Sequence, residues 1–176
     1  MTCGSLSTHL QSRFLDTTKH RCWLDEEQNC ATFALWTFAG NLAGYQRYRP
    51  DKDKSLNNDP RGRYCTRKTN SMLSVWGLES WSFSRTLYVT EGLFDAARLT
   101  WNNMSAIAVF SNNLSKELVN WLWVVQQTRP VVAVCDSDVA GARFKKYFKH
   151  HYVVRSAKDL SEASDTEVQS LISSGR

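Results

Sequence analysis

The sequence contains no hydrophobic run long enough to cross a membrane. No apolar stretch approaches the roughly 20 residues that a membrane-spanning helix needs. The start of the chain, Met1 to Ser5, also lacks the basic and apolar segments of a secretory signal peptide. Internal repeats and low-complexity tracts are absent as well. We therefore expect a cytoplasmic protein that has no membrane partner.

The cysteines follow no pattern of disulfide-rich or zinc-binding proteins. There are five of them, an odd number, and no CxxC pair occurs. Cys22 and Cys30 lie near His20, but this spacing matches no common zinc motif. We expect reduced thiols, no disulfide framework and no bound zinc.

The length and composition are those of a folded protein with one domain, or one domain and an appendage. The chain has 176 residues, of which 42% are hydrophobic, and this is enough for a core. Core packing is the default for most of its seven tryptophans. Trp36 and Tyr45 lie beside a basic segment, and they are the aromatic residues to test for base stacking.

Positive charge is concentrated in one segment. The net charge is +5, and residues 47–68 alone carry an excess of five positive charges, from eight basic and three acidic side chains. Such a local excess attracts polyanions, among which nucleic acid is the obvious candidate. A solvated basic loop explains the charge equally well at this point. The basic residues are Arg47, Arg49, Lys52, Lys54, Arg61, Arg63, Arg67 and Lys68.

The first half of the sequence indicates a small β-rich unit. Gly40 and Asn41 form a turn signal between a β-prone segment, 32–38, and an alternating segment, 42–48. This pattern predicts a hairpin whose second strand carries Arg47 and Arg49 toward a polar face. Residues 50–70 are predicted to form a long basic loop with a short strand at 63–66. Weaker signals indicate a short helix near Leu10, a turn or helix start at 23–29, and a helix or strand at 71–78.

The second half alternates strands and helices. Strands are predicted at 87–90, 105–110, 131–135 and 152–155, and helices at 93–102, 114–127, 139–150 and 161–172. Such alternation implies an α/β fold with a parallel sheet flanked by helices. A boundary near Arg85 divides the chain into a basic β-rich subdomain, 1–85, and an α/β domain, 86–176. His150 and His151 are expected at a helix end, complementing its dipole.

Acidic residues follow three of the predicted strands. Glu91 and Asp95 come after the first strand, Asp136 and Asp138 after the third, and Asp159 after the fourth. The carboxyl ends of parallel strands share one edge of the sheet, where ligands bind. Carboxylates gathered there repel one another unless a cation lies between them, and oxygen ligands suit Mg²⁺. The pattern therefore predicts a magnesium site.

Each of these residues alone also has an ordinary structural explanation. Asp138 or Asp159 is in the position of a helix N-cap, and Glu91 is placed to interact with the dipole of the following helix. The metal site is favoured because three strand ends deliver acid to the same edge.

The acidic segments resemble the three motifs of the toprim domain. They read Thr-Glu-Gly-Leu-Phe-Asp at 90–95, Cys-Asp-Ser-Asp-Val-Ala-Gly at 135–141, and Lys-Asp at 158–159. Within that group the second motif, followed by Arg143, is most similar to the bacterial and phage DNA primases. The basic segments at 42–49 and 63–64, and Trp-Gly-Leu at 76–78, are similar to the region that precedes toprim in a primase core.

The resemblance implies a primase-like nucleotidyltransferase that makes short primers on single-stranded DNA in replication. It implies that Asp136, Asp138 and Asp159 bind Mg²⁺, for which Mn²⁺ can substitute, and that Glu91 and Asp95 act in catalysis. Nucleotide triphosphates and template phosphates are expected on a set of basic residues. These are Arg47, Arg49, Lys54, Arg63, Arg67 and Lys68.

The sequence departs from the family in lacking a zinc-binding module and a helicase segment. A helicase or a zinc-module protein is therefore an expected partner, and the reduced size suggests a phage or mobile element. Three alternatives remain open: a toprim nuclease, a non-catalytic toprim protein that binds nucleic acid or a replication partner, and, ranked last, a phosphatase of the Asp-x-Asp type.

Overall fold

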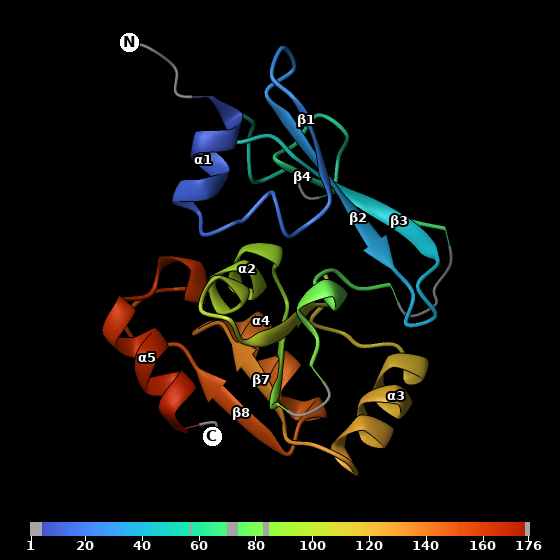
Figure 1. Cartoon of the computed structure of the whole chain (residues 1–176), viewed down its shortest axis with the longest axis vertical. Coiled ribbons are helices and arrows are strands. Elements are labelled where there is room, and N and C mark those ends of the chain that lie inside the picture. Colours follow the sequence, from blue (N-terminus) through green and yellow to red (C-terminus); the bar gives the residue numbers. More distant parts are fainter. Residues whose placement is uncertain (1–4, 57, 70–73, 83–84, 175–176) are drawn as a thin grey trace.

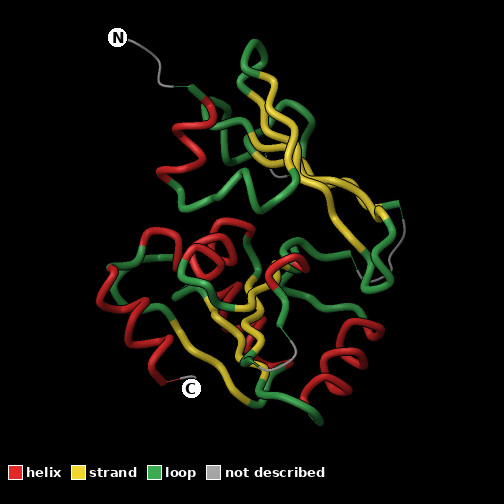
Figure 2. The backbone as a smooth tube through the Cα atoms, in the orientation of Figure 1, coloured by secondary structure: helices red, strands yellow, loops and turns green. Residues whose placement is uncertain are grey.

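The computed structural model describes residues 5–56, 58–69, 74–82 and 85–174, which form two four-stranded sheets (Figure 1). In the view of Figure 1 an antiparallel sheet lies above a parallel sheet, and α1, Leu6–Ser12, packs beside the upper one. Figure 2 shows that the helices belong mostly to the lower half, where they flank the parallel strands. The predicted α/β fold with a preceding β-rich part is confirmed.

The antiparallel sheet has the order β1-β2-β3-β4. The predicted hairpin is confirmed as β2, Cys30–Trp36, and β3, Leu42–Tyr48. The predicted short strand is β4, Tyr64–Lys68. The interpretation of 23–29 as a turn or helix start was wrong for its first residues, because β1, Cys22–Asp25, pairs with β2 as an edge strand.

The parallel sheet has the order β6-β5-β7-β8, with all neighbours parallel. Every residue of β5, Leu87–Thr90, and β6, Ser105–Ala108, is buried, because helices cover both faces of such a sheet. The strand β7, Val131–Cys135, was predicted with its observed bounds. The helices α2, Leu93–Trp101, and α3, Lys116–Gln126, also lie where they were expected.

Two predictions near the C-terminal end of the chain were wrong in detail. The helix predicted at 139–150 ends early, as α4, Val139–Phe144, and a 3₁₀ turn, η2, Lys145–Tyr147. Phe144 and Phe148 both enter the core, and Phe148 does so from an extended backbone. The next strand, β8, His150–Val153, therefore starts early, so His150 and His151 belong to a strand and do not end a helix.

The last predicted helix, 161–172, is divided in two. A 3₁₀ turn, η3, Leu160–Glu162, precedes α5, Asp165–Ser174. The chain is extended at Ala163 between them. Glu167 in the first turn of α5 accepts hydrogen bonds from the backbone N–H groups of Arg155 and Ser156, which fixes α5 against the end of β8.

One hydrophobic core joins the two sheets. Leu10, Phe33 and Tyr48 from the first half are buried in the same cluster as Tyr88 and Phe94 from the second. Trp76 is fully buried, and its backbone forms a bridge to Ala108 at the end of β6. Part of the predicted element at 71–78 lies outside the described residues; its remainder forms isolated bridges and enters the 3₁₀ turn η1, Leu78–Ser80. The division into 1–85 and 86–176 stays a prediction.

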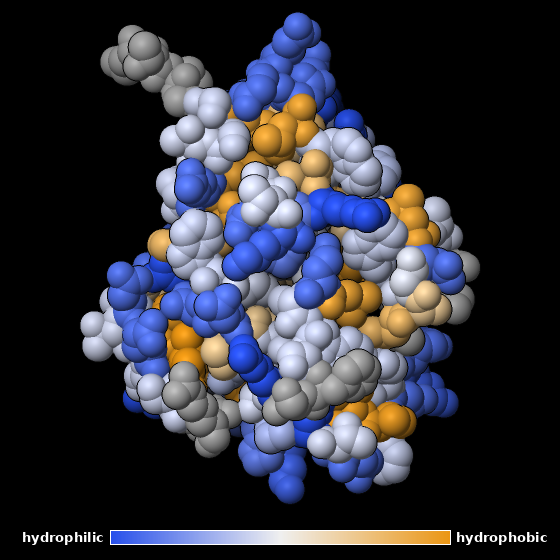
Figure 3. Space-filling view, viewed as in Figure 1, coloured by the Kyte–Doolittle hydropathy of each residue, from blue (hydrophilic) through white to orange (hydrophobic). Residues whose placement is uncertain are grey.

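The surface is largely polar in the view of Figure 3, with hydrophobic residues in separate small patches. Among the described helices, none has the length and apolar character needed to cross a bilayer.

Candidate active site

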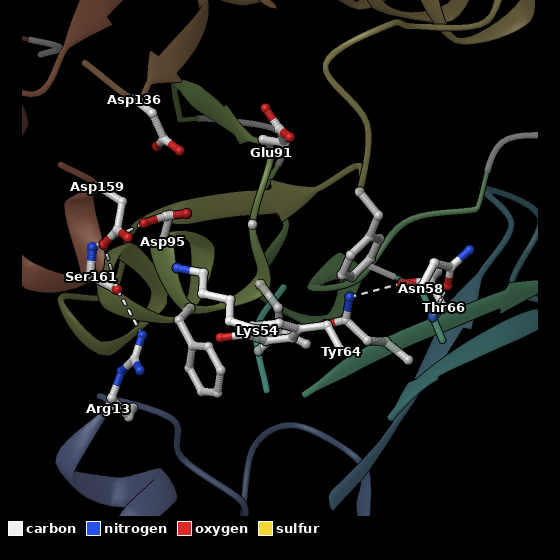
Figure 4. A pocket seen from close by; sticks show the side chains of 15 residues that line it. Arg13, Lys54, Asn58, Tyr64, Thr66, Glu91, Asp95, Asp136, Asp159 and Ser161 are labelled. Atoms are coloured by element: carbon white, nitrogen blue, oxygen red, sulfur yellow. Dashed lines mark hydrogen bonds between the residues drawn. The ribbon is translucent and has the colours of Figure 1, made fainter. Parts of the chain in front are cut away.

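A pocket of about 440 Å³ lies where the two sheets face each other. Its acidic wall comes from the ends of the parallel strands and from α2. Its opposite wall comes from α1, β3, β4 and the basic loop (Figure 4). The polar and charged side chains that line it, together with Tyr64, are Arg13, Gln46, Lys54, Asn58, Thr66, Glu91, Asp95, Asp136, Asp159 and Ser161.

The fold brings four of the five predicted acids to this pocket. Glu91 follows β5 and Asp136 follows its neighbour β7, whose register pairs Thr90 with Val134. Asp95 lies in the first turn of α2, and Asp159 follows the chain segment after β8. Adjacent parallel strands end at one edge, so residues 45 or more positions apart meet there.

The carboxyl groups of this pocket are close enough to raise one another's pKa. Burial, followed by repulsion from Asp136 and Asp138, raises the pKa of Glu91 to about 7. Burial, followed by Asp159 and Asp138, raises the pKa of Asp136 to about 6, against the opposing effect of Lys158 and Lys54.

Asp95 is the most strongly affected of these acids. Burial raises its pKa to about 8, with smaller contributions from Asp136 and Asp159. The Ser161 N–H, which donates to Asp95 Oδ1 at 2.9 Å, and the charge of Arg13 oppose this rise. Near neutral pH the pocket therefore retains a proton on Asp95 and, for part of the time, one on Glu91, and a bound cation would displace them.

Asp138 and Asp159 also have the structural role that their positions allowed. Asp138 Oδ1 accepts from the N–H groups of Ala140 and Gly141, at 2.9 and 3.1 Å, and so caps α4. Asp159 Oδ1 accepts from Ser161 Oγ at 2.7 Å and from the Glu162 N–H at 3.2 Å. In both residues the cap uses one carboxylate oxygen and leaves Oδ2 for another partner. Asp138 Oδ2 lies 3.7 Å from the Lys158 ammonium.

The carboxylate oxygens of the pocket suit a hard cation, but the described side chains are not grouped closely enough to coordinate one. Within the described residues, no three His, Cys, Asp or Glu side chains are grouped closely enough to hold an ion. Glu91 Oε2 is buried there and has no hydrogen-bond partner in the described part of the chain. A buried acceptor of this kind is costly unless a cation or a donor satisfies it.

The six predicted basic residues do not all face the pocket. Lys54 lines it, and its ammonium group points toward the acidic wall (Figure 4). Lys68 Nζ lies nearby, donating to the Val109 carbonyl at 3.1 Å above the ring of Phe110. Arg49 and Arg63 hold the basic loop together through the carbonyls of Pro60 and Lys52.

Arg47 and Arg67 lie on the opposite face of the antiparallel sheet from the pocket. Gln46 pairs with Thr66 across β3 and β4, and both line the pocket. Because side chains alternate along a strand, Arg47 and Arg67 point the other way. Any contact of these two arginines with nucleic acid stays a prediction, and it would lie outside the pocket.

Arg13 and Ser161 are among the pocket residues that were not predicted from the sequence. Arg13, the C-cap of α1, has its guanidinium 4.4 Å from the ring centre of Phe94, and its Nη2 donates to Ser161 Oγ at 2.9 Å. Ser161 Oγ in turn donates to Asp159. No pattern marks an isolated arginine near the start of the chain. By contrast, strand alternation could have placed Gln46 and Thr66 on the opposite face of the sheet from Arg47.

The sequence matches no protein-family profile and no curated protein, whereas several solved structures match the fold. The primase fragment of the bacteriophage T7 primase-helicase protein superposes with a TM-score of 0.64 and 15% identity, over 90% of this chain and 68% of that one. The RNA polymerase domain of Mycobacterium tuberculosis primase DnaG, in complex with double-stranded DNA, gives 0.60 and 16%, over 97% and 64%.

The DnaG primase catalytic domain bound to single-stranded DNA gives a TM-score of 0.59 and 15% identity, over 82% of this chain and 53% of that one. The chain thus spans about half to two thirds of the length of these proteins. Identities this low establish the fold alone. As its motifs predicted, the chain has the toprim-containing fold of the catalytic cores of bacterial and phage DNA primases.

Proposed function

We propose that this chain is a primase-like nucleotidyltransferase that synthesises short primers on single-stranded DNA in replication. The observation that carries the proposal is the convergence of four carboxyl groups in one pocket, opposite the cations Lys54 and Arg13 (Figure 4). Carboxylates bind magnesium and cations bind phosphate, so the two walls supply both parts of a phosphoryl-transfer site.

The metal would be held by Asp136, by Asp138 and Asp159 through their Oδ2 atoms, and by Glu91 as a further ligand or as the base. When bound, Mg²⁺ or Mn²⁺ aligns the attacking and leaving oxygens and neutralises charge on the transferred group. The unpartnered Glu91 Oε2 and the raised pKa values of Glu91 and Asp136 support this assignment.

Other side chains of the pocket bind and orient the nucleotide. Lys54 and Arg13 bind the phosphates, and the wall formed by Gln46, Tyr64 and Thr66 leaves room for a nucleoside. Glu91 Oε2 accepts the proton of the attacking hydroxyl, since a pKa of about 7 suits a base that works near neutral pH. Asp95 positions Ser161, and through it Arg13, by accepting the Ser161 N–H.

The proposed partners follow from the structural neighbours and from the charge. One neighbour is bound to single-stranded DNA, and another belongs to a primase-helicase protein. We therefore propose single-stranded DNA as template, nucleotide triphosphates as substrates, and a helicase or zinc-module protein as partner, in the cytoplasm of a bacterium or phage-infected cell. Arg49 and Arg63 of the basic loop, and Lys68 of β4 beside the pocket, would contribute to template binding.

A non-catalytic toprim protein that binds nucleic acid is the second candidate. It is favoured by the use of Asp138 and Asp159 as helix caps and by the absence of a three-ligand group among the described residues.

Incubation with labelled nucleotides, Mg²⁺ and a single-stranded DNA template decides between these functions. Template-dependent products that disappear in Asp136→Asn support the proposal, with Glu27→Gln, an exposed acid that does not line the pocket, as matched control. Shortened template would instead identify a nuclease. Binding without turnover under Mg²⁺ or Mn²⁺, unchanged in Asp136→Asn, would identify the non-catalytic protein.

A further inference from the structure

The antiparallel sheet has two faces of opposite character. Phe33, Leu35 and Tyr48 point to the core, and Gln46 and Thr66 on the same face line the pocket. In Figure 1 both α1 and α2 lie on this side of the sheet. Side chains alternate along a strand, so the neighbours of these core-facing and pocket-facing residues point to the other side of the sheet.

The outer face carries two exposed aromatic side chains and two arginines, on three of the four strands. Trp23 and Arg47 flank Thr32 from both sides, through the pairs Trp23–Thr32 and Thr32–Arg47. Tyr45 is paired with Arg67 in the next row. Trp23 is 59% and Tyr45 38% exposed, and Arg67 is exposed as well. We call Trp23, Tyr45, Arg47 and Arg67 the arginine–aromatic face.

We propose that the arginine–aromatic face binds single-stranded DNA, at a site separate from the acidic pocket. Exposed tryptophan and tyrosine rings stack on bases of any sequence, and arginine both pairs with phosphates and stacks on rings. The guanidinium of Arg47 already lies 6.0 Å from the ring centre of Tyr45. Arg47 is half-buried, and in the described part of the chain it forms no salt bridge and its buried Nε has no hydrogen-bond partner, so no carboxylate neutralises its charge.

Asn58 connects the face with the pocket at the edge of β4. Arg67 Nη1 donates to the Asn58 carbonyl at 3.4 Å, while Asn58 Oδ1 accepts the Thr66 N–H at 2.7 Å. Asn58 and Thr66 both line the pocket. A strand stacked on the outer face would reach the pocket by passing over Asn58 at this edge. The choice of DNA over RNA rests on the proposed function, but binding to the face does not require catalysis.

The test measures binding of a labelled oligo-dT to the full chain by fluorescence anisotropy over a range of salt concentrations. Trp23→Ala/Tyr45→Ala is expected to weaken binding at least about tenfold, because two stacked bases are lost, and to leave the salt dependence unchanged. Arg47→Gln/Arg67→Gln is expected to weaken binding and to lower the slope of log K against log salt by about 1.4, or about 0.7 for each phosphate contact.

Three further variants serve as controls. Lys146→Gln/Lys149→Gln removes the same charge from an exposed segment elsewhere and is expected to change binding less than threefold. Tyr45→Phe keeps the ring and is expected to bind like the wild type, which separates stacking from misfolding. Asp136→Asn is expected to keep oligo-dT binding. A loss of primer synthesis is therefore distinguishable from a loss at the face, and failure of either proposal leaves the other standing.

Several results would overturn the proposal. Unchanged oligo-dT affinity in both double variants of the face would do so, as would an equal loss in Lys146→Gln/Lys149→Gln. Tighter binding of oligo-U than of oligo-dT would exclude DNA as the ligand of this face. A change of oligomeric state in Trp23→Ala/Tyr45→Ala, with oligo-dT binding intact, would assign the face to protein contacts.

Discussion

Replacing Asp95 by asparagine should remove a large part of the pH dependence of the protein's stability. The folded-state pKa of Asp95 is raised from 3.8 to about 8, chiefly by burial. An acid with a raised folded pKa stabilises the fold while it is protonated, and this contribution is lost as the pH rises from the unfolded toward the folded pKa. Without metal, the wild type should therefore become less stable between about pH 4 and about pH 8.

The size of this effect follows from the linkage relation. Between the two pKa values one group contributes up to about 1.4 kcal/mol for each pH unit. From about pH 5 to about pH 8 this gives an upper limit of about 4 kcal/mol. For a chain of this length each kcal/mol corresponds to about 2–4 °C in Tm. Asp95→Asn keeps an oxygen for the Ser161 N–H but carries no charge, so it should lose this slope.

The assay is thermal unfolding in EDTA at several pH values, followed by circular dichroism. We expect Asp95→Asn to match the wild type near pH 5 and to exceed it by several degrees near pH 8, while the exposed control Glu27→Gln follows the wild type throughout. Mg²⁺ should raise the Tm of the wild type more at pH 8 than at pH 5, because fewer protons compete with it. Parallel curves for Asp95→Asn and the wild type would refute the electrostatic reasoning.

Three further changes test individual parts of the site. Arg13→Ala should raise the KM for nucleotide about tenfold with a smaller effect on kcat. Arg13→Lys should restore the wild-type KM only in part, because lysine lacks the planar fork. Equal KM values for the wild type and Arg13→Ala in steady-state assays would show that Arg13 does not bind the nucleotide. Asp138→Ser should keep the cap of α4 and lose activity. Asp138→Ala should lose activity and, in urea titrations, about 1 kcal/mol of stability as well. An active serine variant would show that Asp138 serves only as a cap. Gly141→Ala would place a Cβ 2.0 Å from the Asp136 carbonyl oxygen. It should therefore destabilise the chain by about 1–3 kcal/mol and displace Asp136. Wild-type activity and Tm in Gly141→Ala, with Ala142→Gly as control, would contradict this.

The acidic half of the site could be predicted from sequence because each of its residues directly follows a strand. Val131–Cys135 is apolar and ends in Asp136, so the place where the strand ends and the residue that leaves it were both visible. Parallel topology then required Glu91 and Asp136 to meet. Local signals and one rule for α/β sheets were therefore enough to predict this half of the site.

The opposite half could not be predicted because it depends on contacts between distant segments. Arg13 reaches Ser161 across 148 positions, and nothing near it in sequence announces that contact. The charge of the basic segment was visible, but charge does not determine a direction: Arg47 and Arg67 belong to the outer face, and Arg49 and Arg63 bind carbonyls of their own loop. Helix 139–150 was overestimated because the core contacts of Phe148 outweigh helix periodicity.

The central claim is that carboxylates from separate strand ends surround a divalent cation, and a crystal structure in Mn²⁺ tests it most directly. We predict an anomalous peak about 2.0–2.3 Å from carboxylate oxygens of Asp136 and at least one of Glu91, Asp138 and Asp159, and its loss in Asp136→Asn. A well-ordered pocket without such a peak at saturating Mn²⁺, or a peak that persists in Asp136→Asn, would contradict the claim.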